Sequence, residues 1–270
     1  MQTALQNFAH VDVWQEIRAE AQQASATEPV LASFYHASIL NHHSFAAAIS
    51  FHLANKLDSQ ALPAMMLREV FEEAMKADAT IEDAMRADIR AHRERDPACK
   101  LFFMPFLFFK GYHALQSWRI SHWLWQQGRN ALALYFQNQI SQAFDVDIHP
   151  GARIGKGIMI DHATGVVIGE TAVIDDDVSM LHSVTLGGSG CVKTDRHPKI
   201  RRGVLIGVGA KILGNIEVGE GAKIGAGSVV LESVAPHTTV AGVPAKLVGR
   251  PKGESPALDM DHHLNESDDC

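Results

Sequence analysis

The 270-residue chain is 46% hydrophobic and 20% charged, which is the composition of an ordinary globular protein. Its net charge of -7 argues against nucleic acid or an anionic membrane as the main partner, because both require clustered Lys and Arg side chains. No run reaches the ~18 apolar residues of a membrane helix. We therefore expect a protein that acts on a small molecule.

Three cysteines, Cys99, Cys191 and Cys270, are widely spaced and form no Cys-x-x-Cys pair. This usage fits a reducing compartment and argues against a disulfide framework or a cysteine-based zinc site. The first residues also lack the basic and apolar segments of a secretion signal. Together these features predict a cytoplasmic location.

Residues 1–144 show the spacing of α-helices. Apolar side chains recur every three or four positions between charged ones, as in Ala64, Met65, Leu67, Val70, Phe71 and Met75. The pattern predicts five or six helices, with Asp12 capping one of them and Thr80 starting another. Between Tyr112 and Phe144 we expect a helix pair that is broken near Gly128.

After residue 145 an aliphatic side chain recurs every six positions. A helix or a single strand would repeat every 3.6 or two residues, so this period requires a different fold. One short strand per hexapeptide, followed by a turn, builds a triangular coil whose aliphatic side chains stack inside. The positions are Ile148, Ile154, Ile160, Ile168, Ile174, Met180, Leu186, Ile206, Ile212, Val218, Ile224 and Val230. A β-sandwich is disfavoured because five consecutive repeats from Ile206 share one register.

These two patterns predict an α+β protein with segregated halves. An all-α N-terminal domain occupies residues 1–144, a parallel β-helix residues 145–250 and a flexible C-terminal tail residues 251–270. The six-residue register breaks twice, and loops leave a solenoid at such breaks. Two extra residues occur beside Asp161 and His162, and a longer insertion over 187–203 gathers polar and charged side chains.

The hexapeptide pattern resembles that of the left-handed β-helix acyltransferases, which are trimers that use acyl-CoA or acyl carrier protein. Longer motifs are similar to those of the bacterial serine O-acetyltransferase family. They include Asp147-Ile-His-Pro, Ile158-Met-Ile-Asp-His-Ala-Thr-Gly, Gly169-Glu-Thr-Ala-Val-Ile, Asp195-Arg-His-Pro-Lys-Ile and, in the helical half, Lys110-Gly-Tyr-His-Ala-Leu-Gln. The resemblance implies a left-handed coil and transfer of acetyl from acetyl-CoA to the hydroxyl of L-serine, in cysteine biosynthesis.

Such a reaction requires a base that removes the proton of an alcohol, and histidine suits this task near neutral pH. The resemblance gives this role to His162, at the first break in the register. It pairs Asp147 with that base, holding one ring nitrogen protonated so that the other faces the substrate. Without the resemblance, Asp147 would be interpreted as a turn or capping residue.

Free serine carries an ammonium and a carboxylate, so its site needs acidic side chains and a cation. The resemblance assigns Asp96 and Asp161 to the ammonium. It assigns Arg196 and His197 to the carboxylate. An Arg fork matches a carboxylate with two parallel hydrogen bonds, which a lysine cannot reproduce.

Acetyl-CoA is expected as a co-substrate, with no permanently bound cofactor. In the family, CoA lies along the coil near the loop, where small side chains leave the backbone open. The residues expected on this path are Gly188, Ser189, Val208, Gly209, Lys223, Ala226 and Gly227. Val208 departs from the alanine that is common there in relatives. No Ser or Cys lies in a convincing nucleophile motif, so we expect direct attack on the thioester in a ternary complex.

The family also implies an assembly and a regulator. We expect a homotrimer or a dimer of trimers, in which the 187–203 loop of one subunit lies beside the coil of the next. L-cysteine is expected as a feedback inhibitor that competes with serine. Relatives end in an isoleucine that docks into O-acetylserine sulfhydrylase, whereas this chain ends in Cys270. A complex with that enzyme is therefore expected to be weak or absent.

Three alternatives stay open at this point. Another hexapeptide acyltransferase would act on homoserine or a sugar amine, and a non-catalytic protein would only bind partners. A metal enzyme like the γ-class carbonic anhydrases, which share the coil, would bind zinc through histidines such as His149, His162, His182 and His197. It would leave the helical domain and the Asp-Arg-His-Pro loop unexplained, so we expect no metal.

Overall fold

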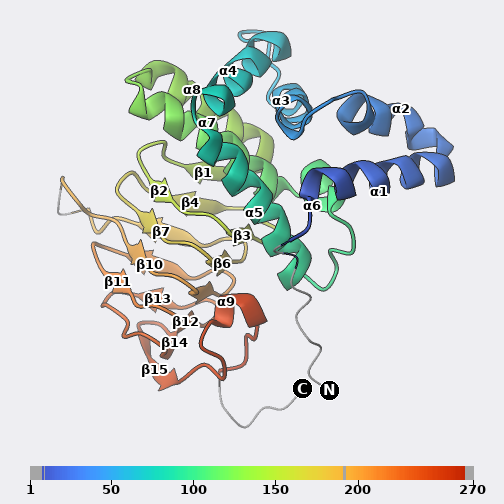
Figure 1. The fold of residues 1–270 in the computed structure, drawn as a ribbon. Helices are drawn as coiled ribbons and strands as arrows, with labels where there is room; N and C mark the ends of the chain where they lie inside the picture. The colour runs from blue at the N-terminus through green and yellow to red at the C-terminus, as the bar shows by residue number, and fades with distance from the viewer. Residues whose placement is uncertain (1–7, 9, 191–192, 265–270) are drawn as a thin grey trace.

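The computed structural model describes residue 8, residues 10–190 and residues 193–264 (Figure 1). The predictions for Cys191 and for the Cys270 terminus fall outside these described residues. Over the part that is described, the N-terminal helices stand at one end of a stacked coil of strands. None of the described helices combines the length and apolar character that crossing a membrane requires.

The N-terminal half is helical, as predicted. Asp12 caps the first helix, since its carboxylate accepts hydrogen bonds from the backbone N–H groups of Trp14 and Gln15. The predicted start at Thr80 is wrong, because the nearby Asp78 caps that helix by accepting from the N–H of Thr80. The helices are α1 (Val13–Thr27), η1 (Pro29–Leu31), α2 (Ala32–Tyr35), η2 (His36–Leu40), α3 (Phe45–Lys56), α4 (Ala64–Ala77), α5 (Ala79–Arg95), α6 (Phe103–Phe108), α7 (Lys110–Gln126) and α8 (Asn130–Phe144).

The predicted helix pair is present as α7 and α8. They are separated at Gly128, whose φ of +74° lies in the left-handed region that glycine adopts without steric cost. The break near Gly128 is thereby confirmed.

The second half is a parallel β-helix, which confirms the fold prediction. Three sheets form its sides: β1, β4, β7, β10 and β13 the first, β2, β5, β8 and β11 the second, and β3, β6, β9, β12, β14 and β15 the third. The strands are β1 (Val146–Ile148), β2 (Arg153–Ile154), β3 (Met159–Ile160), β4 (Val166–Ile168), β5 (Val173–Ile174), β6 (Ser179–Met180), β7 (Thr185–Gly187), β8 (Lys199–Ile200), β9 (Leu205–Ile206), β10 (Lys211–Leu213), β11 (Glu217–Val218), β12 (Lys223–Ile224), β13 (Val229–Val230), β14 (Thr239–Gly242) and β15 (Ala245–Gly249). Of the twelve aliphatic positions predicted inside the coil, all but Ile154 are buried.

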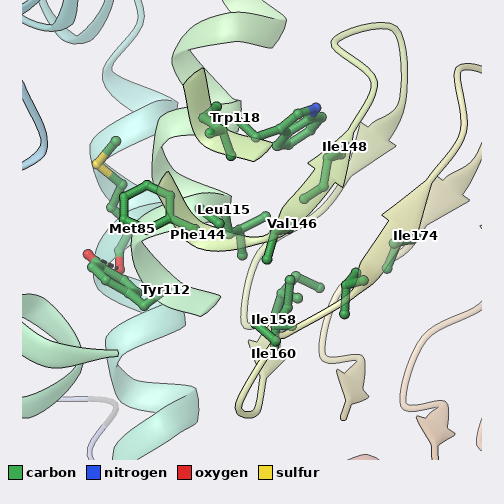
Figure 2. Close-up of a cluster of buried hydrophobic side chains, with 14 of the residues drawn as sticks. Met85, Tyr112, Leu115, Trp118, Phe144, Val146, Ile148, Ile158, Ile160 and Ile174 are labelled. Carbon is green, nitrogen blue, oxygen red and sulfur yellow. Dashed lines mark hydrogen bonds between the residues drawn. The ribbon is translucent and has the colours of Figure 1, made fainter. Parts of the chain in front are cut away.

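One hydrophobic core runs from the helices into the coil. Figure 2 shows Leu115 and Trp118 of α7 beside Val146 and Ile148 of the first coil, and Tyr112 of α7 next to Met85. The two halves pack closely at Gly111, where an added Cβ would lie 2.1 Å from the carbonyl oxygen of Ile160. The helical half therefore rests directly on the strand that precedes His162.

Residues 251–264, expected as part of a flexible tail, instead pack along the coil. They form the short helix α9 (Pro256–Asp259), in which Ala257 is fully buried. This helix contacts α5, β6 and β9 (Figure 1). The periodicity of the sequence gave no sign of this packing, because the contacts are made by single residues.

Candidate active site

The turn between β3 and β4, at the corner of the third and first sheets, carries His162. His162 and Ala163 have φ values of 57° and 61°, a left-handed backbone that side chains seldom adopt. This turn accommodates the two extra residues of the register break and leaves the His162 side chain 73% exposed. Its Nε2 atom lies 3.7 Å from Oδ2 of Asp161, and its ring centroid lies 5.7 Å from that of His182 one coil further on. We call this the His162 corner.

A pocket of about 460 Å³ opens at the His162 corner, between the coil and the helical half. Asp161 and His162 line it from the coil, and Asp96 lines it from the end of α5. Three of the predicted site residues therefore come together although 65 positions separate Asp96 from Asp161.

The same pocket is lined by His92 and Lys110, which the sequence analysis did not assign to the site. Burial, followed by the nearby Arg95 charge, lowers the pKa of His92 to about 3, so this ring is neutral. His92 lies one helical turn before Asp96, and Lys110 opens a motif that resembles the family. In the sequence, these two features were the signals that could have placed His92 and Lys110 in the pocket.

Asp147, the expected partner of the base, lies on β1 opposite Val167 of β4. Its Oδ1 atom accepts a hydrogen bond of 2.7 Å from Nε2 of Gln137 in α8. Within the described residues it makes no hydrogen bond with His162. The expected Asp147–His162 pair is therefore not formed in this structure.

Arg196 lies at a different corner, between the first and second sheets. Its Nη2 atom donates to Oε2 of Glu170 at 2.7 Å, and Nη1 donates to the carbonyl of Thr194 at 3.1 Å. The hydrogen bond from Arg196 lowers the pKa of Glu170 and keeps this carboxylate ionised. We call this the Arg196 corner.

His197 is held in place by Thr171. The Thr171 hydroxyl accepts hydrogen bonds from the backbone N–H groups of Arg196 and His197 and also contacts Nδ1 of the His197 ring at 2.9 Å. The ring packs so closely on Gly169 that a Cβ there would lie 2.0 Å from its Nε2. Burial, followed by the Arg196 charge, lowers the pKa of His197. Gly169, Glu170 and Thr171 are thus supporting residues that belonged to a quoted motif but received no role.

The two corners lie at opposite ends of β4. From Gly165 to Gly169 the chain advances about 13 Å at the rise of an extended strand. The predicted residues therefore form two groups within one subunit, with the base and the acidic residues in one group and Arg196 with His197 in the other.

The residues expected along CoA divide in the same way. Val208, Gly209, Ala226 and Gly227 follow β9 and β12, which places them at the His162 corner of later coils. Gly188 and Ser189 follow β7 and begin the loop at the Arg196 corner, where Gly188 lies against the Arg196 side chain.

Lys223 does not lie open to a ligand. Its side chain is 3% exposed, and its Nζ atom donates to the carbonyls of Asp261 at 2.7 Å and His263 at 2.6 Å. In this structure the C-terminal segment covers Lys223 and takes its hydrogen bonds. The contact of Lys223 with CoA stays a prediction.

The histidines considered as zinc ligands are also divided between corners. His162 and His182 lie at one corner, and His149 and His197 lie at the other. Among the described residues of one subunit, no group of three or more His, Cys, Asp or Glu side chains is arranged to hold a metal ion.

The β-helix of hexapeptides belongs to the class of hexapeptide transferases, as a family model shows. Residues 197–232 match the family model for the bacterial transferase hexapeptide (six repeats). Residues 13–117 match that for the serine acetyltransferase N-terminal domain.

A curated serine acetyltransferase of Escherichia coli strain K12 is 61% identical over 253 residues, covering 94% of this chain and 93% of that protein. A solved serine acetyltransferase in complex with cysteine is 57% identical, with a TM-score of 0.92, and covers 94% of this chain and 99% of that one. A third, from Brucella abortus strain S19 in complex with coenzyme A, is 51% identical, with a TM-score of 0.87 and coverage of 88% and 95%. The chain belongs to the serine acetyltransferase family, which confirms the resemblance.

Proposed function

We propose that the protein transfers the acetyl group of acetyl-CoA to the hydroxyl of L-serine, with His162 as general base. The observation that carries this proposal is the pocket that is lined by an exposed histidine and by two acidic side chains, Asp96 and Asp161. Serine fits such a pocket because its ammonium pairs with carboxylates while its hydroxyl reaches a base.

The reaction follows from these groups. Neutral His162 accepts the hydroxyl proton as the serine oxygen attacks the carbonyl carbon of the thioester. When the tetrahedral intermediate collapses, the carbon–sulfur bond breaks and the departing CoA sulfur takes the proton from the histidine. The products are O-acetyl-L-serine and CoA, and no acetyl-enzyme forms.

We also propose that the site is completed between subunits of a trimer. Three copies around an axis parallel to the coil would bring the His162 corner of one subunit beside the Arg196 corner of the next. The outer row of the first sheet would then face the axis, and Val167 in this row is 39% exposed. Exposed Val30 and Met65 in the helical half, at 87% and 74%, fit a second contact that joins two trimers.

Cysteine inhibition fits the same groups. L-cysteine differs from L-serine only in sulfur for oxygen, so Asp96, Asp161 and Arg196 would bind both molecules. The cytoplasmic location and the weak or absent sulfhydrylase complex stay predictions.

Replacement of the base tests the assignment. His162→Ala is expected to lower kcat by about 100-fold to 10,000-fold while acetyl-CoA binding is retained. His237→Ala is the matched control, because His237 is also exposed in a turn with a positive φ of 51° but lies outside the pocket. Thiol release should be followed with serine, homoserine and threonine as acceptors. More than about a tenth of wild-type activity in His162→Ala would refute the role.

A further inference from the structure

Arg95, the last residue of α5, lies directly before Asp96 and is 2% exposed in its side chain. Its guanidinium donates from Nη1 to the carbonyl of Gly157 at 2.8 Å and to Oγ of Ser179 at 3.1 Å. Its Nη2 atom donates to Oδ1 of Asp177 at 3.3 Å. The end of α5 is therefore tied to two successive coils.

These coil residues lead into the pocket. Gly157 precedes β3, whose last residue is followed by Asp161 and His162. Ser179 of β6 pairs in register with Met159 of β3. Arg95 thus connects the segment that carries Asp96 with the strand that leads into Asp161.

Asp96 has few other restraints. Its backbone N–H donates to the carbonyl of His92, and its Oδ1 atom accepts from the N–H of Ala98. Its carbonyl accepts from the N–H of Cys99. All three contacts are local to the end of α5, so none of them fixes Asp96 relative to the coil.

We propose that Arg95 is a positioning residue that sets the separation of the Asp96 and Asp161 carboxylates and thereby the affinity for the serine ammonium. The proposal rests on the assignment of those two residues to serine. An ammonium contact is the same in the bound substrate and in the transition state, so its loss raises KM for serine and leaves kcat nearly unchanged.

The C-terminal segment contributes to this arrangement. The Ser179 hydroxyl, which accepts from Arg95, donates to the carbonyl of Ala257 in α9 at 2.8 Å. Ser179 and Ala257 are both fully buried. Helix α9 therefore keeps water from the Arg95 hydrogen bonds, which strengthens them.

The test compares Arg95→Lys with Arg119→Lys. Arg119 is also buried and also donates to a coil carbonyl, that of Gly155 at 2.8 Å. It lies on α7, and neither of its neighbours in the chain lines the pocket, whereas Arg95 directly precedes Asp96. Both variants should lower Tm. Only Arg95→Lys should raise KM for serine, by about tenfold, with kcat and KM for acetyl-CoA within about twofold. Ser179→Ala, which removes one of the three acceptors, should raise KM for serine by about threefold.

An unchanged serine KM in folded Arg95→Lys would overturn the proposal, and so would equal increases in Arg95→Lys and Arg119→Lys. If Arg95→Lys does not fold, an unchanged serine KM in Ser179→Ala would overturn the proposal. Asp96→Asn tests the assignment of the serine site separately from the role of Arg95. If it leaves serine KM unchanged, the assignment of the serine site fails, whatever Arg95 does.

Discussion

Mixing two inactive variants tests whether the active site lies between subunits. His162→Ala removes the base, and Arg196→Ala removes the cation that we assign to the serine carboxylate. Within one subunit these groups lie at corners separated by β4, and Arg196 contacts Glu170 rather than any residue of the His162 pocket. Each variant alone lacks one group at every site, and with serine well below its KM each should have little activity.

The fraction of activity that is regained depends on how the two variants combine in a trimer. In a trimer whose sites form between neighbours, a site is intact when its base comes from the Arg196 variant and its loop from the His162 variant. With equal amounts of both subunits, each choice has a probability of about one half, so about a quarter of the sites are intact. A site within one subunit would give no intact sites, since no subunit carries both groups.

The assay is thiol release from acetyl-CoA with serine, after co-expression of the two variants with different affinity tags and purification through both tags. Each variant co-expressed with a differently tagged copy of itself is the control. An activity near a quarter of wild type is expected before correction for the selection by tags. Activity no higher than the average of the two variants would refute a shared site.

Three further predictions concern stability and partners. Asp88→Asn should lower the free energy of unfolding, measured in urea, by about 3 to 5 kcal/mol, because it leaves the buried charge of Arg119 unpaired. A decrease of less than about 1 kcal/mol would contradict this expectation. Burial would raise the pKa of Asp261, but hydrogen bonds, including one from Lys223, outweigh it and lower the pKa from 3.8 to about 2. The docking of the C-terminal segment should therefore be strongest above pH 3.8 and weaken as the pH falls towards 2. Asp261→Asn should increase the rate of hydrogen exchange at the Ala257 amide about 30-fold. An unchanged exchange rate would contradict this expectation. Calorimetry of the C-terminal decapeptide with O-acetylserine sulfhydrylase should show no sub-micromolar binding, and such binding would reverse the expectation drawn from Cys270.

The coil could be predicted because its signal is local and repeated. Each inward side chain stacks on an equivalent side chain in the next coil, so the period of six appears in the sequence itself. The break after Ile160 marked the turn of His162 for the same reason, since two extra residues cannot fit a regular turn. The helix break at Gly128 likewise depended on one residue and its neighbours.

The unpredicted features depend on single contacts between distant segments. Lys223 was assigned to CoA because it lies on the expected path, but residues near 261 bind its ammonium. A polar C-terminal sequence suggests a flexible tail, and nothing in its spacing reveals that Ala257 is buried against β6. Outward-facing side chains carry no periodic signal, so their partners cannot be deduced from the pattern.

The buried charges between the helices and the coil have a common physical cause. β1, β2 and β3 are the end strands of their sheets, so one side of the first coil has no neighbouring coil to pair with. Backbone groups of residues 155–158 on this side need other partners, and Asp88, Arg95 and Arg119 supply them. This same stretch leads directly into Asp161 and His162. The contacts that satisfy the open end of the coil are therefore the ones that hold the helices against the segment before the catalytic turn. A change in any of them should lower stability, whereas only the loss of the Arg95 contacts, directly before Asp96, should also lower serine affinity.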